Sequence, residues 1–147
     1  MNIARLKEKF VRGPYGYDIP YTDIAAFHGD VVADVTLGSY SGDMLFILRD
    51  RATGLYGYVS TGYGSCTGCD ELQHIILELD YGDVESVEKA WAELAAFVDE
   101  MRPTVWRAAP EMLAWLNDHD WQGDWLGGDE SAVRTWITNE VAPKLAA

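Results

Sequence analysis

The sequence predicts an α+β fold in one domain, because its hydrophobic pattern changes once along the chain. Residues 31–61 contain short segments in which apolar and polar side chains alternate with a period of two, which is typical of strands in a half-buried sheet. Residues 71–142 instead place apolar side chains three and four positions apart, the spacing of amphipathic helices. The chain of 147 residues has the length of one ordinary domain.

Three strands are expected in residues 31–61. The first, over 31–37, alternates small apolar residues with polar ones, and the third, over 55–61, alternates Leu, Val and Thr with Tyr and Ser. The second, over 44–48, is apolar on both faces and should be the central strand. Because short connections join antiparallel neighbours, the pattern predicts a three-stranded antiparallel meander.

Helices are expected on either side of this sheet region in the sequence. Residues 1–30 should hold a short helix over 2–11, followed by an irregular segment rich in Gly and Pro. After the sheet, a helix begins behind Asp70 and Gln73, which form a pattern similar to a capping box. Further helices are expected over 84–101, about 110–118 and about 130–142, and these C-terminal helices should cover the sheet.

The helix over 84–101 has the clearest periodicity and should be the main cover of the sheet. Charged residues occupy its other face. We therefore expect its apolar positions to be buried, Trp91 included: Val84, Val87, Trp91, Leu94, Val98 and Met101.

The chain is strongly acidic, with a formal net charge of −13. Binding to a phosphate backbone depends on a surplus of Lys and Arg, so the charge disfavours direct nucleic-acid binding. No apolar run approaches the roughly 20 residues of a membrane-spanning helix, and residues 1–7 lack the apolar core of a secretory signal. We therefore expect a cytoplasmic protein with no membrane partner.

The only two cysteines, Cys66 and Cys69, lie between the third strand and the following helix. A Cys-x-x-Cys pair beside a helix N-terminus fits redox chemistry, although the carboxylates of Asp70 and Glu71 would raise a thiol pKa. Cys66, Cys69 and His74 could instead supply part of a tetrahedral zinc site. The glycines of the segment could also bind an anion, or could simply allow a tight strand-to-helix turn. No cofactor is required by the sequence, and zinc is the possible one.

The same segment carries a resemblance to known proteins. Residues 63–70 read Tyr-Gly-Ser-Cys-Thr-Gly-Cys-Asp. This resembles a segment, Tyr-Gly-Ser-Cys-Ser-Gly-Cys-Asp after an aromatic strand, shared by small uncharacterised proteins of actinobacterial viruses and their hosts. The likeness covers about residues 35–75, with Thr67 where Ser is usual. It implies a phage origin and a bacterial cytoplasm, and it implies no activity.

An acidic, glycine-rich loop over 118–129 separates the last two expected helices. Its Asp and Gly spacing partly matches a twelve-residue calcium loop. Gln122 and Asp129 are poor substitutes for the ligands required at positions five and twelve, so we expect no strong calcium binding. Trp121 and Trp125 in this loop are candidates for an exposed platform that binds a partner, since Trp is enriched at binding hot spots.

The sequence contains no common catalytic motif such as Gly-x-Ser-x-Gly, His-Glu-x-x-His or a phosphate-binding loop. We therefore expect a small acidic accessory protein that binds a host or viral macromolecule, with a protein as the expected partner. Two alternatives remain open. One is a zinc-stabilised binding domain that uses the cysteine segment, and the other is an enzyme without a recognisable motif.

Overall fold

The computed structural model describes residues 2–14, 16–38, 41–64, 70–122 and 129–146. Its central element is an antiparallel sheet with the strand order β3-β4-β5-β6. The strands are β3 (Asp30–Gly38), β4 (Gly42–Arg49), β5 (Tyr56–Tyr63) and β6 (Trp106–Arg107). The α+β prediction is confirmed. The sheet is larger than the expected meander, because β6 pairs with Tyr56 and Gly57 of β5.

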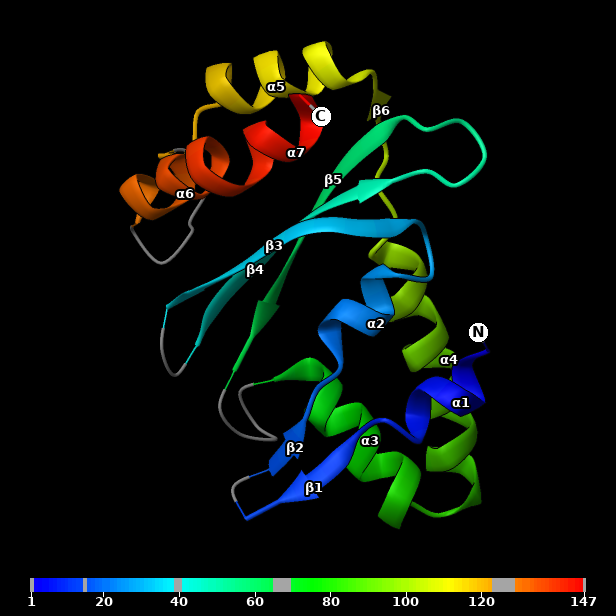
Figure 1. Ribbon diagram of the computed structural model, residues 1–147. Helices are drawn as coiled ribbons and strands as arrows, with labels where there is room; N and C mark the ends of the chain where they lie inside the picture. Colours follow the sequence, from blue (N-terminus) through cyan, green and yellow to red (C-terminus); the bar gives the residue numbers. More distant parts are fainter. Residues whose placement is uncertain (1, 15, 39–40, 65–69, 123–128, 147) are drawn as a thin grey trace.

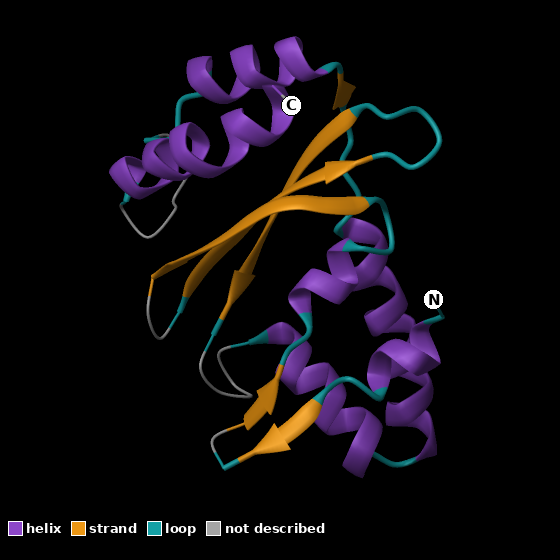
Figure 2. Ribbon diagram, viewed as in Figure 1, coloured by secondary structure: helices purple, strands orange, loops and turns teal. Residues whose placement is uncertain are grey.

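Helices cover both faces of this sheet, as Figures 1 and 2 show. On one face lie α1 (Ile3–Lys7), α2 (Tyr21–Ala25), α3 (Glu71–Tyr81) and α4 (Val84–Glu100). On the other lie α5 (Ala109–Asp118), α6 (Glu130–Trp136), the π-helical turn η1 (Ile137–Val141) and α7 (Ala142–Ala146). The expected cover from the C-terminal half is therefore only part of the arrangement, since the N-terminal segment contributes to one layer. Among the described residues, no helix is both long enough and apolar enough to span a membrane.

The residues of β4 show why the sheet needs two layers of helices. Leu45 and Ile47 belong to the core cluster shared with α5, α6, η1 and α7, while Phe46 and Leu48 belong to the cluster shared with α1–α4. All four side chains are fully buried. The prediction of a central strand at 44–48 is thus confirmed, because apolar side chains on both faces must both be removed from water.

The N-terminal segment is more regular than its composition suggests. The expected helix over 2–11 ends early, at Lys7, and two short strands follow it, β1 (Val11–Gly13) and β2 (Gly16–Asp18). The two strands pair antiparallel, and Gly16 in β2 has a φ of 142°. The prediction of an irregular segment is therefore wrong for the residues of these strands. Each strand has only three residues, too few to give an alternating pattern.

The last predicted helix, over 130–142, is interrupted by the π-helical turn. The N–H of Ala142 bonds to the carbonyl of Ile137, five residues earlier. Pro143, in the first turn of α7, has no N–H to donate to the carbonyl of Asn139 and its ring would clash there. A local widening of the helix avoids that clash, which accounts for the turn at this position.

Helix α4 buries only part of the face that was expected. Leu94, Val98 and Met101 are buried as expected, and Ala90 and Phe97 are buried with them. Val84 is 78% exposed and Trp91 is 36% exposed, so the prediction that both are buried is wrong. Helix α4 packs beside α3, and this contact rotates the apolar stripe toward Ala90 and Phe97.

Candidate functional site

The base of the cysteine segment is held by a buried carboxylate. Asp70 is 4% exposed and caps the N-terminus of α3 by accepting the N–H of Gln73 at 3.1 Å. Its other carboxylate oxygen accepts the Tyr21 hydroxyl at 2.7 Å and the Gly64 N–H at 3.0 Å. Three donors therefore converge on one side chain. One comes from α2, one from the residue that follows β5, and one from the first turn of α3.

Gln73 extends this network to the N-terminal ribbon. Its Nε2 donates to the Gly64 carbonyl at 3.2 Å, and its Oε1 accepts the N–H of Tyr17 at 3.2 Å. A Cβ on Gly16 would lie 2.1 Å from that Oε1, so the close approach requires glycine. The predicted capping pair at 70 and 73 is therefore confirmed for Asp70, while the Gln73 side chain ties β2 to the end of β5.

Asp70 and Gln73 join the two ends of the cysteine segment, at Gly64 and at the start of α3. Cys66 and Cys69 themselves lie outside the described residues, so the redox, zinc and anion hypotheses for them stay predictions. The third zinc candidate, His74, lies on the exposed side of α3. It lines a hollow of about 180 Å³ between α3 and α4, together with Glu78 and Glu93. In the part of the chain that the structure describes, no group of three His, Cys, Asp or Glu is placed to hold a metal ion.

A second polar cluster lies where α1, β2 and α3 meet. The Tyr17 hydroxyl donates to Asp80 at 2.7 Å, and Lys7 Nζ approaches the same carboxylate at 2.6 Å. Burial acts to raise the pKa of Asp80, but the hydrogen bonds from Lys7 and Tyr17 outweigh it and leave that pKa below its ordinary value. Burial and the hydrogen bond to Asp80 raise the pKa of Tyr17 from 10.0 to about 12. Burial and the bond to Asp70 also raise the pKa of Tyr21.

The raised pKa of Tyr17 makes the stability of the fold depend on pH in the alkaline range. The folded protein holds the Tyr17 proton more tightly than the unfolded chain, so its contribution is complete below pH 10 and is lost as pH rises through about 12. We expect the free energy of unfolding to fall across this range, and to fall less steeply in Tyr17→Phe. Urea unfolding at stepped pH values measures both slopes. Equal slopes in the two proteins would contradict the assignment.

The expected tryptophan platform at 121 is not exposed. Trp121 is 1% exposed, and its Nε1 donates to the Leu116 carbonyl at 2.9 Å. Its ring contacts His119 and Tyr58, with centroid distances of 4.5 Å and 5.6 Å. Trp121 therefore belongs to the core between α5 and the sheet, and the prediction that it forms an exposed platform is wrong. Trp125 lies outside the described residues.

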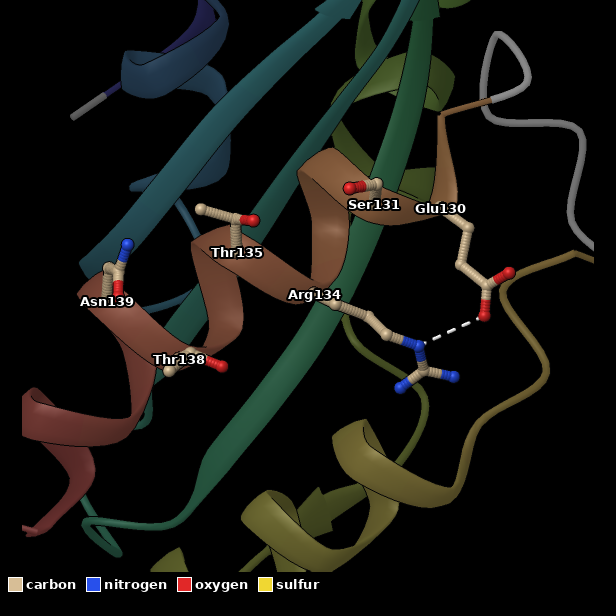
Figure 3. Close-up of a pocket in the computed structure, with 6 residues that line it drawn as sticks. All are labelled: Glu130, Ser131, Arg134, Thr135, Thr138 and Asn139. Carbon is tan, nitrogen blue, oxygen red and sulfur yellow. Dashed lines mark hydrogen bonds and ion pairs between the residues drawn. The ribbon is translucent and has the colours of Figure 1, made fainter.

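An open hollow of about 570 Å³ lies along α6 and η1, and Figure 3 shows the residues that line it. Arg134 points toward Glu130 there, with an Nε to Oε1 distance of 3.0 Å, and it also donates to the Asn117 carbonyl at 3.3 Å. All the lining residues come from one continuous helix: Glu130, Ser131, Arg134, Thr135, Thr138 and Asn139. We interpret the hollow as the solvated polar face of that helix.

The turn between α3 and α4 lies beside β1 at one end of the molecule (Figure 1), and exposed apolar side chains lie on both sides of it in the sequence. We call Arg12, Leu77, Tyr81 and Val84 the corner patch. Tyr81 is 65% exposed and Val84 is 78% exposed. The Arg12 guanidinium lies over the Tyr81 ring, 5.1 Å from its centroid, and also donates to the Tyr81 hydroxyl. A hollow of about 380 Å³ opens here, lined by Arg12, Leu77, Glu78, Tyr81 and Gly82.

Comparison of the chain with protein families, curated proteins and solved structures finds no match. The assignment of a site therefore depends on the geometry of this chain alone.

Sequence reasoning missed the corner patch because it placed Val84 and Trp91 on a buried face. One signal was available. Val84 is the first residue of α4, directly after the N-cap Asp83, and it lies between two acidic residues in the sequence. Trp91 follows seven residues later on the same side of α4 and is 36% exposed.

Proposed function

We propose that this chain is an acidic accessory protein that binds a protein partner through the corner patch. The observation that carries the proposal is Tyr81, an aromatic side chain that is 65% exposed yet held in place by a stacked arginine. Tyr and Arg are among the residue types that dominate the energy of protein interfaces.

The stacked pair is already ordered before a partner arrives. Arg12 fixes the Tyr81 ring through both the cation–π contact and the hydrogen bond to its hydroxyl. Less side-chain entropy is then lost on binding, which favours affinity. Tyr81 and Val84 are exposed, and the hollow lined by Leu77 and Tyr81 is a depression into which a partner's apolar side chain can fit.

The charges around the corner patch indicate the partner's chemistry. Glu78 lines the hollow, and Asp83 and Glu85 flank Val84 in the sequence. The whole chain has a formal net charge of −13. A partner with an apolar anchor and a rim of Lys and Arg is therefore favoured, and salt should weaken the association by screening it.

Affinity capture with matched variants tests the proposal. We expect the immobilised chain to retain a specific protein from an actinobacterial extract, the source to which the resemblance of residues 63–70 points. Replacing Tyr81 and Val84 by Ser should reduce retention at least about tenfold, as expected for losing two central contacts. The control is Val105→Ser, because Val105 is 48% exposed and lies outside the corner patch. Equal retention by the double variant and by wild type would overturn the proposal.

A further inference from the structure

Strand β3 leaves one long side of the sheet unpaired within the part of the chain that the structure describes. It is the terminal strand in the order β3-β4-β5-β6, and it spans nine residues, Asp30–Gly38. The opposite terminal strand, β6, has only two residues. An edge of this length presents a row of main-chain donors and acceptors to any extended chain that approaches.

The main-chain groups that face outward can be identified from two contacts. A Cβ on Gly42 would lie 2.0 Å from the Leu37 carbonyl oxygen, and the Tyr63 hydroxyl of β5 donates to that same oxygen at 2.8 Å. The Leu37 carbonyl therefore points toward β4. Alternate residues of an antiparallel strand point both main-chain groups the same way, and the register is regular from Ala33 to Gly38. Asp34 and Thr36 thus direct their N–H and C=O groups away from β4.

Only the first part of this edge is covered by the described residues. Lys144 donates to the Val32 carbonyl at 2.9 Å, and a register shift between Val31 and Ala33 interrupts the strand there. Bulges and lysines are the usual means by which edge strands avoid unwanted pairing. Beyond them, the side chains of Asp34 and Thr36 are both exposed. The open part of the edge is therefore residues 34–38.

We propose that an extended segment of a partner protein, with Lys or Arg at alternate positions, pairs with β3 along residues 34–38. Main-chain hydrogen bonds to Asp34 and Thr36 would hold the partner segment against β3. A cationic side chain opposite the Asp34 carboxylate would make a basic segment bind more tightly than a neutral or acidic one. A second copy of this chain is disfavoured because each copy has a formal net charge of −13. This site is independent of the corner patch, since it involves a different element and different residues.

A fluorescent peptide of alternating Lys and Val tests this pairing by anisotropy titration. Thr36→Pro removes the outward N–H and leaves the bonds between β3 and β4 intact, because proline is tolerated on the open side of an edge strand. We expect Thr36→Pro to weaken peptide binding at least about tenfold, while Thr36→Ala, which keeps the N–H, binds within about twofold of wild type. A peptide of alternating Glu and Val should not bind.

Three results would overturn the proposal. The first is equal peptide binding by folded Thr36→Pro and wild type, with the fold checked by circular dichroism. If Thr36→Pro does not fold, the Lys-Val peptide with its main-chain nitrogens methylated replaces it on wild-type protein, and equal binding by that peptide is the second. The third is a dimer in sedimentation of the wild type that Thr36→Pro abolishes and a Lys-Val peptide cannot dissociate, which would assign the edge to a second copy. None of these results alters the outcome of the capture experiment on Tyr81 and Val84.

Discussion

Asp70→Ala is expected to lower the free energy of unfolding by about 3–5 kcal/mol, since three buried donors lose their acceptor together. These are the Tyr21 hydroxyl and the N–H groups of Gly64 and Gln73. A buried donor left without an acceptor loses its hydration as well as its bond, which is why the effect exceeds that of an ordinary helix cap. The midpoint and slope of urea unfolding measure it.

Asp83 is the matched control for this prediction. It caps α4 by accepting the Ser86 N–H at 2.8 Å, but it is exposed. Asp83→Ala should therefore cost only about 1 kcal/mol, the usual value for a surface cap. If the Asp70 and Asp83 variants were destabilised equally, the cluster around Asp70 would not hold the base of the cysteine segment as described.

Trp121→Ala is expected to cost about 3–5 kcal/mol, the range for truncation of a fully buried aromatic side chain. The indole fills the space between α5 and β5, where it meets His119, Tyr58 and Trp115. Its Nε1 also donates a hydrogen bond to the Leu116 carbonyl near the end of α5. Truncation would leave a cavity in the core cluster on this face of the sheet and remove that bond.

Trp91→Ala provides the comparison, because Trp91 is 36% exposed while Trp121 is 1% exposed. We expect Trp91→Ala to lower the free energy of unfolding by about 1 kcal/mol, as is usual for substitutions of partly exposed residues. Thermal or urea unfolding of the two variants side by side measures the difference. A larger loss for Trp91 than for Trp121 would show that the burial of α4 and of residues 119–121 is assigned wrongly.

Strands β3, β4 and β5 of the sheet could be predicted from the sequence, whereas the burial of single side chains such as Trp91 could not. Alternation predicted β3 and β5, and a short run that is apolar on both faces predicted β4, each to within two residues at each end. Periodicity on α4 predicted a helix correctly but not which flank of its apolar stripe is buried. That choice depends on the neighbouring helix α3, which a single-helix pattern does not contain.

Other elements were missed for separate reasons. Strand β6 has two residues, too few to form a pattern, and exists only because Gly57 allows close approach to Pro103 and Trp106. The buried role of Trp121 depends on long-range contacts with Tyr58 of β5, while a glycine-rich acidic loop suggested exposure. The corner patch likewise forms only when β1 brings Arg12 to the end of α3. Local pattern determines the elements, and tertiary packing determines which side chains remain on the surface.

The most direct test of binding through the corner patch is site-specific photo-crosslinking in an actinobacterial cell. A photo-reactive amino acid is placed at Val84 in one protein and at Val105 in another, both exposed positions. The proposed function predicts one discrete protein adduct from position 84 that is lost when Tyr81 is also replaced by Ser, and no such adduct from position 105. The same adducts from both positions, or none from position 84, would contradict it.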